Sequence, residues 1–88
     1  MRILIFSSSS CSVCLPLKEK LKRIAREFGA DFREIDVEKE REEAVRRMIF
    51  SAPTVVLEVG GKEFGIWSGV FSVSEIEEAV RRLKEIVS

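Results

Sequence analysis

The sequence predicts an α/β domain whose strands and helices follow one another in the order βαβαββα. Three observations predict this fold class: an apolar run at the start of the chain, amphipathic stretches with a 3.6-residue period, and a Gly60-Gly61 pair between two strand-like segments. A strand–helix–strand unit pairs its strands in parallel through a right-handed crossover, whereas a hairpin is antiparallel. We therefore expect a four-stranded mixed sheet with helices on both faces.

The first half of the chain is expected to contain two strands and two helices. Ile3 to Phe6 form an apolar strand, and Cys14 to Phe28 carry apolar residues at helical spacing, with Gly29 as the C-cap. Phe32 to Val37 are expected to form the second strand, and Glu38 to about Ile49 the second helix. The buried stripe of that helix is expected to consist of Ala44, Val45, Met48 and Ile49.

The second half is expected to contain a hairpin followed by a helix. Val55 to Val59 form a strand too apolar to be exposed on both faces, Gly60-Gly61 make a two-residue turn, and Lys62 to Ile66 return as the fourth strand. Ser72 and Glu75 predict a capping box at the start of the last helix. The inner face of that helix is expected to consist of Ile76, Ala79, Val80, Leu83, Ile86 and Val87.

Length and composition exclude several classes of function. The chain has 88 residues, which suits one domain over residues 1–88 with a single core. Its 15 Lys and Arg balance 15 Asp and Glu, so no overall field attracts nucleic acid or an anionic membrane. No apolar run approaches the roughly 18 residues of a membrane span, and the short apolar start does not resemble a secretory signal. We expect a cytoplasmic monomer.

The residue types that are missing also restrict the chemistry. The chain has no His, so a Cys–His dyad, a His-ligated metal and an imidazole acid or base are all excluded. It has no Asn or Gln but many Glu, Lys and Arg residues, a composition typical of thermophiles.

The only two cysteines form the motif Cys11-Ser12-Val13-Cys14, at the predicted junction of the first strand and first helix. Unpaired N–H groups and the helix dipole favour negative charge at a helix N-terminus, so a cysteine there loses its proton more easily. Two thiols at this spacing can also close into a disulfide, which points to thiol–disulfide chemistry. A structural zinc needs four ligands, so metal binding would require a second chain or added carboxylates.

Pro53 is the second informative residue, because it precedes a buried-looking strand to whose ladder it cannot donate a hydrogen bond. It fits at the first position of that strand, with a cis Ala52–Pro53 bond. Together with the Cys11–Cys14 motif and the βαβαββα order, this pattern resembles the thioredoxin and glutaredoxin superfamily over essentially the whole chain. Further similarities are Ser51-Ala52-Pro53-Thr54, the Gly60-Gly61 turn and Gly69 before the last helix. The length is closer to that of a glutaredoxin.

This resemblance implies a thioredoxin-like protein disulfide oxidoreductase. Cys11 would be the exposed attacking thiol and Cys14 the buried resolving one. The backbone of Ala52 would pair with an extended substrate segment, and Pro53 would pack beside the dithiol. Trp67 and Gly69 would add to the substrate surface. The implied partners are proteins that contain disulfides and a flavin-dependent electron donor of the thioredoxin-reductase type, with no bound cofactor or metal.

The chain departs from the family pattern at several positions. Ser10 stands where thioredoxins usually have Trp, and Ile5 stands where they bury an Asp. Glutaredoxins hold glutathione with Thr-Val before the cis-proline and an acidic turn before the last helix; here the matching pairs are Ser51-Ala52 and Gly69-Val70. Two alternatives remain open: a thioredoxin-fold adaptor or metal-binding protein, and a glutathione-dependent glutaredoxin.

Overall fold

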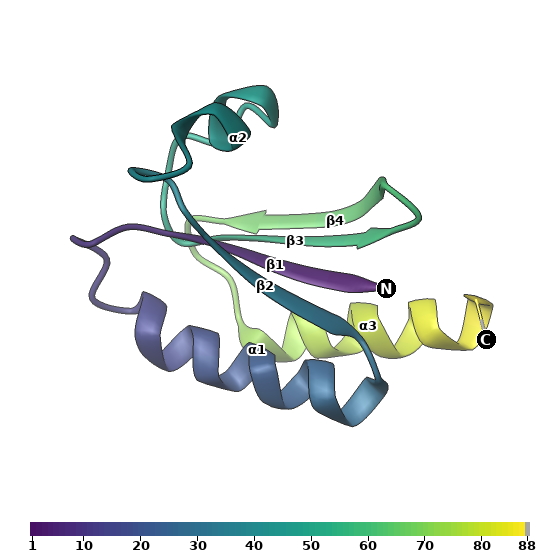
Figure 1. The fold of residues 1–88 in the computed structure, drawn as a ribbon. Coiled ribbons are helices and arrows are strands. Elements are labelled where there is room, and N and C mark those ends of the chain that lie inside the picture. The colour runs from purple at the N-terminus through teal and green to yellow at the C-terminus, as the bar shows by residue number, and fades with distance from the viewer. Residues whose placement is uncertain (88) are drawn as a thin grey trace.

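A computed structural model describes residues 1–87, for Val87 the backbone alone, and its elements follow the predicted order (Figure 1). They are β1 (Arg2–Ser7), α1 (Cys14–Phe28), β2 (Asp31–Asp36), α2 (Arg41–Arg46), β3 (Thr54–Val59), β4 (Lys62–Ser68) and α3 (Val73–Val87). The four strands form one sheet in the order β2-β1-β3-β4. β1 and β2 are parallel, whereas β1–β3 and β3–β4 are antiparallel, so the predicted mixed sheet is confirmed.

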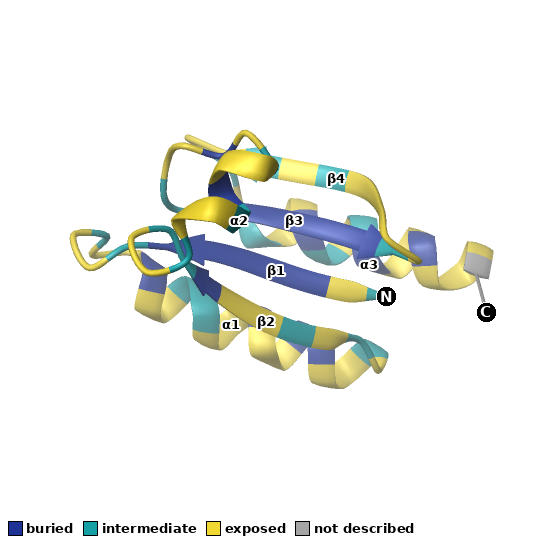
Figure 2. Ribbon diagram, turned by 45° about the horizontal axis from the view of Figure 1, so that its top comes forward, coloured by how far each residue is buried: buried dark blue, intermediate teal, exposed yellow. Residues whose placement is uncertain are grey.

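The sheet lies between two helical layers, with α1 and α3 on one face and α2 on the other (Figure 1). Successive side chains of a strand point to opposite faces, so the two central strands supply both halves of the core. Ile3 and Ile5 of β1 join the cluster under α1 and α3, whereas Leu4 and Phe6 join the cluster under α2. β1 and β3 are accordingly buried along most of their length (Figure 2).

The second helix is shorter than the sequence predicts, because α2 covers only Arg41–Arg46. On its N-terminal side, the Asp36 carboxylate accepts hydrogen bonds from the backbone N–H groups of Glu38 and Lys39, at 2.8 and 3.2 Å, and holds this segment in turns. On its C-terminal side, Met48 adopts a left-handed conformation with φ 58° and ends the helix. The predicted stripe is half wrong: Ala44 and Ile49 are buried, whereas Val45 and Met48 are exposed.

The end of the chain also refines the prediction. The Gly60-Gly61 turn is confirmed, with φ values of 58° and 83° that favour glycine. At the start of α3, the N–H of Glu75 donates a hydrogen bond to the Ser72 carbonyl, and the Ser72 hydroxyl pairs with the Ser74 hydroxyl. The Ser72 hydroxyl therefore does not make the bond to the Glu75 N–H that the predicted capping box requires.

Most of the predicted inner face of α3 is correct, but Ile86 is exposed. Its neighbour Val87, also expected there, has a side chain outside the described part of the chain. α1 and α3 each have 15 residues, fewer than the roughly 20 that a bilayer requires. Within residues 1–87, no helix is long and apolar enough to cross a membrane.

Candidate active site

The two cysteines lie where β1 passes into α1, joined to each other by a disulfide with a Cα–Cα distance of 5.5 Å. Cys14 is the first residue of α1, and Cys11 belongs to the loop before it. Turn hydrogen bonds shape this loop: the N–H of Cys11 donates to the Ser8 carbonyl at 3.2 Å, and that of Cys14 to the Cys11 carbonyl at 3.4 Å. The local fold therefore closes the two sulfurs onto one another.

The two cysteines differ in exposure. Cys14 is 5% exposed, whereas Cys11 is only partly buried. Val13 occupies the N-cap position without a side-chain cap, and the first turn of α1 has no acidic residue. Uncapped N–H groups and the helix dipole favour negative charge at this end, so the helix stabilises a thiolate when the disulfide is reduced.

Glu38 ties the loop that carries Cys11 to the segment between β2 and α2. One of its carboxylate oxygens accepts hydrogen bonds from the Ser9 N–H at 2.9 Å and the Ser9 hydroxyl at 2.8 Å. These two bonds lower the pKa of the Glu38 carboxyl, because they stabilise its charged form. The Ser10 hydroxyl pairs with Ser8 rather than with the helix. The sequence does not predict these hydrogen bonds between Ser9 and Glu38, because the two residues are 29 positions apart.

The cis-proline loop lies at the same end of the sheet as the dithiol. The Ala52–Pro53 bond is cis, as the sequence predicts, and β3 begins at the next residue. Thr54 pairs with Phe6 near the end of β1, which brings Pro53 level with the loop that begins after Ser7. The Thr54 hydroxyl donates to the Ser51 carbonyl at 2.8 Å and holds the loop in place.

A groove of about 350 Å³ lies beside the disulfide loop. Its walls come from α1, from the cis-proline and from the segment that leads into α3. The lining residues are Val13, Pro16, Leu17, Lys20, Pro53, Gly69, Phe71 and Val73. Every one of them is uncharged except Lys20. The groove therefore offers a mainly apolar surface next to the loop that carries the disulfide, which it meets at Val13.

Three of the four residues expected to bind substrate lie in or next to the groove, and the fourth, Trp67, does not line it. Pro53 and Gly69 both line the groove, and Ala52 directly precedes Pro53. Trp67 does not line it: this side chain is partly buried against the core cluster under α1 and α3, with its ring over Gly65. Phe71 takes part in the groove wall instead.

Sequence reasoning did not place the α1 wall of the groove in the site, although a signal was present. The residues Val13, Pro16, Leu17 and Lys20 stand at helical spacing i, i+3, i+4 and i+7, which puts them on one side of α1 beginning inside the Cys11–Cys14 motif.

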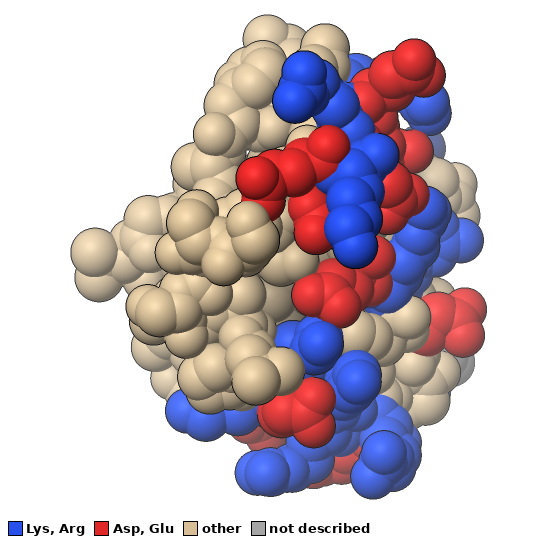
Figure 3. Space-filling view, turned by 60° about the vertical axis from the view of Figure 1, so that its left-hand side comes forward, with Lys and Arg blue, Asp and Glu red and all other residues tan. Residues whose placement is uncertain are grey.

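The surface at the end of the molecule that carries the dithiol loop is divided between uncharged and charged side chains. In Figure 3, which turns that end toward the viewer, uncharged side chains gather over one half of the surface and charged ones over the other. Several large apolar side chains are exposed in the segments around the site, at 55% for Val13, 62% for Leu15 and 75% for Phe50.

Comparison with solved structures identifies the fold and the family. Thioredoxin 1 from the thermophilic eubacterium Thermosipho africanus is 31% identical over 98% of this chain and 97% of its own, with a TM-score of 0.94. The chain belongs to the thioredoxin family. Thioredoxin from Fasciola hepatica is 26% identical over 92% of this chain and 78% of its own, with a TM-score of 0.81. A mutant thioredoxin from Halobacterium salinarum shares the fold, at 21% identity over 99% of this chain and 77% of its own, with a TM-score of 0.87. No protein-family model and no curated protein sequence matches the chain.

Membership of the thioredoxin family and the Cys11–Cys14 disulfide together support thiol–disulfide oxidoreductase activity in general. The departures from the thioredoxin pattern are visible in the structure. Ile5, at the position of the buried Asp, is completely buried in the cluster under α1 and α3. Ser10, at the position of the preceding Trp, is an exposed residue of the dithiol loop.

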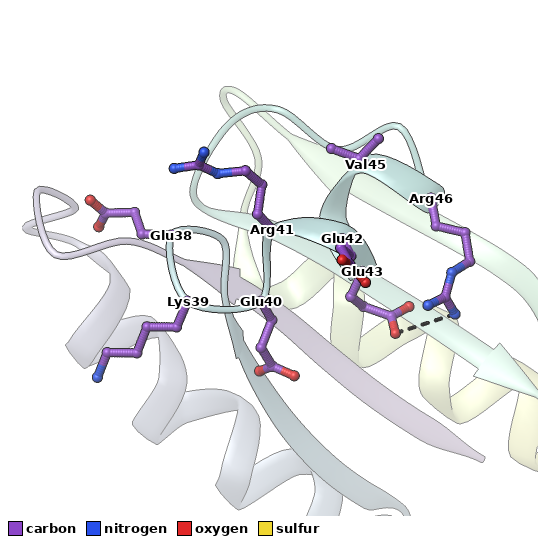
Figure 4. A pocket seen from close by; sticks show the side chains of 8 residues that line it. All are labelled: Glu38, Lys39, Glu40, Arg41, Glu42, Glu43, Val45 and Arg46. Carbon is purple, nitrogen blue, oxygen red and sulfur yellow. Dashed lines mark ion pairs between the residues drawn. The ribbon is translucent and has the colours of Figure 1, made fainter.

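A larger hollow of about 870 Å³ lies over α2, on the other face of the sheet from α1 (Figure 4). Seven of its eight lining residues are charged, and both signs are mixed. Figure 4 shows their side chains pointing in different directions, with Glu43 and Arg46 paired to each other. Among residues 1–87, no group of three or more His, Cys, Asp or Glu side chains is placed to hold a metal ion. The charged side chains over α2 therefore do not form a metal site.

Proposed function

We propose that this protein reduces disulfide bonds of other proteins, with Cys11 as the attacking thiol and Cys14 as the resolving one. One observation carries the proposal: the disulfide lies at an uncapped helix N-terminus, and its loop borders an apolar groove that includes the cis-proline. The difference in exposure supports the order of the two thiols, because a bulky substrate reaches the partly exposed Cys11 more easily than the buried Cys14.

The reaction runs in two exchange steps. The Cys11 thiolate attacks one sulfur of the substrate disulfide; a mixed disulfide forms, and the other substrate sulfur leaves as a thiolate that takes a proton from water. Cys14 then loses its proton and attacks the Cys11 sulfur, which releases the second substrate thiolate. Two electrons have passed to the substrate, and the protein ends with the Cys11–Cys14 disulfide present in this structure.

The substrate would lie in the groove as an extended segment. Its backbone would pair with Ala52, while Pro53 and Gly69 would contact it from two sides. A flavin-dependent reductase of the thioredoxin-reductase type would return two electrons to the disulfide and close the cycle. Such a cycle suits the cytoplasm, where reductases keep thiols reduced.

Two single substitutions test the proposal. Cys11→Ser should abolish reduction of a disulfide-containing protein, because no nucleophile remains at the exposed position. Cys14→Ser should leave the attack intact but block release, so a mixed disulfide between Cys11 and substrate should accumulate and be detected by mass spectrometry after thiol alkylation. Ser12→Ala, which leaves both thiols in place, is the matched control and should turn over.

Either of two results would contradict the proposal. The first is full turnover by the Cys11→Ser protein, which would place the chemistry elsewhere. The second is a substrate adduct on Cys14 rather than on Cys11 when each is the only cysteine left, which would reverse the two roles. An adduct that forms only with glutathione, and that the enzyme then uses in turnover, would favour a glutaredoxin instead.

A further inference from the structure

We infer that Lys20 selects substrates with an acidic side chain close to their reactive disulfide. This inference rests on the proposed function, because it assumes that an extended substrate segment occupies the groove. Lys20 lies on the wall that α1 contributes and is the one charged residue among the residues lining the groove. It is exposed, so its ammonium group is free to meet a ligand.

Among residues 1–87, the neighbouring lysines of α1 have ion-pair partners, whereas Lys20 has none. Lys18 forms an ion pair with Glu34 at 3.3 Å, and Lys22 forms one with Glu19 at 3.7 Å. In the described part of the chain, no carboxylate lies within ion-pair distance of Lys20. A cation without a counter-charge, at the edge of an apolar groove, favours a ligand that brings a negative charge.

The position of Lys20 also sets where that charge should be. Val13 lies within the dithiol motif, and Lys20 follows it by seven residues on the same side of α1. At about 1.5 Å per helical residue, the two are roughly 10 Å apart along the helix axis. An extended segment advances about 3.3 Å per residue, so this spacing corresponds to about three substrate residues. We therefore expect the preferred Asp or Glu about three positions from the cysteine that Cys11 attacks.

Local charge should dominate this preference, because the chain as a whole is neutral, with 15 basic and 15 acidic residues. Long-range steering of a charged substrate is weak for such a molecule. A charge in the groove acts over a short distance and is screened by salt, with a Debye length of about 10 Å at 0.1 M ionic strength. The preference should accordingly weaken as salt is added.

The experiment compares three peptides that differ only in charge. Each contains one cysteine, is oxidised to its symmetric disulfide dimer, and carries either Glu, Gln or Lys at the third position on both sides of the cysteine. Reduced protein is mixed with each peptide at low ionic strength, and the second-order rate of disulfide exchange is measured by acid quench and mass spectrometry. The variants are Lys20→Glu and Lys20→Gln. Lys62→Glu, at the exposed first residue of β4, changes the net charge as much as Lys20→Glu does and is its matched control.

The wild-type protein should reduce the Glu peptide about threefold faster than the Lys peptide, a ratio expected of a single exposed charge pair. Lys20→Gln should bring the ratio close to one, Lys20→Glu should reverse it, and Lys62→Glu should keep the wild-type ratio. A wild-type ratio near one would overturn the inference, and so would a ratio that Lys62→Glu shifts as much as Lys20→Glu does. If the wild-type protein reduces none of the peptides, the proposed disulfide reduction itself fails, and this inference fails with it.

Discussion

Gly65 shows how one residue on β4 depends on the side chain two positions later. A Cβ atom at this position would lie 2.6 Å from Cη2 and 2.9 Å from Cζ3 of Trp67, whose ring covers the glycine. Gly65→Ala should therefore push Trp67 away from the core it covers and lower the free energy of unfolding by about 1–3 kcal/mol. Urea unfolding followed by tryptophan fluorescence measures this directly, because Trp67 is the only Trp in the chain.

Making the Gly65→Ala change in a Trp67→Val protein separates this steric effect from a change in strand propensity. In a Trp67→Val protein the ring is gone, so adding Gly65→Ala should cost little, and unfolding can be followed by circular dichroism. The difference between the two backgrounds measures the coupling between the two positions. An equal loss of stability in both backgrounds would contradict the contact described here.

Single residues also show what the sequence could reveal about the site. Cys11, Cys14 and Pro53 were found because their chemistry and spacing are unusual in themselves. The roles of Ser9 and Lys20 could not be predicted, because they come from neighbours far along the chain: Ser9 donates to Glu38, and Lys20 borders a groove completed by residues before α3. Serine and lysine are common surface residues, so the sequence alone does not distinguish these two from the others.

At the scale of elements, α2 is fixed to the sheet by Arg47, the residue at its C-terminal end. The guanidinium group bonds Glu43 at 2.8 Å and Glu58 of β3 at 3.2 Å. The Glu58 side chain is 8% exposed, so it depends on its arginine partners. Arg47→Met should lower the free energy of unfolding by about 1–3 kcal/mol, because a buried carboxylate loses a charged partner. Chemical denaturation measures the loss.

Arg46→Met is the matched control for this change. Arg46 pairs with the same Glu43 at 3.6 Å, but its own side chain is 72% exposed. An exposed pair contributes about 1 kcal/mol or less, so this variant should stay close to the wild-type protein. Equal losses for the two variants would show that Arg47 has no special role in holding α2.

The same variants have a defined dependence on pH. The hydrogen bond from Arg47 holds the pKa of Glu43 below its ordinary value, and Glu43 in turn raises the pKa of Arg47. The hydrogen bond from Arg47 to Glu43 contributes its full stabilisation above the ordinary carboxylate pKa of about 4.3. This contribution is lost as the pH falls through the lower pKa that Glu43 has in the folded protein. The difference between wild type and Arg47→Met should therefore shrink below about pH 4. A difference that does not shrink as the Glu43 carboxyl becomes protonated would contradict this link between Arg47 and Glu43.

Element boundaries were harder to predict than element types. The charged run from Glu38 to Glu43 favours a helix by composition, yet the Asp36 side chain binds the N–H groups at its start and the helix begins only at Arg41. At the other end, Met48 adopts a left-handed conformation, which the sequence does not predict because methionine rarely adopts it. By contrast, the helix end at Gly29 and the turn at Gly60-Gly61 could be predicted from residue type alone, because glycine readily adopts a positive φ.

At the scale of the whole molecule, the order of elements was predictable and the groove was not. The βαβαββα pattern and the rules for crossovers and hairpins lead to the observed sheet with few alternatives. The groove depends on how closely α1 approaches the segment before α3, and these parts are far apart in the sequence. Only the packing of both helices on one face of the sheet brings Pro16 and Leu17 beside Phe71 and Val73.

Cys11 and Cys14 are proposed to form a reversible redox couple that reduces other disulfides. The most direct test is to titrate the pair against a dithiol buffer and to read the oxidised fraction by thiol alkylation and mass. We expect an intramolecular disulfide that opens and closes reversibly, with a potential near or below about −220 mV, where the cytosolic thiol pool is poised. Failure to close this disulfide, or closure only between two chains, would contradict the claim.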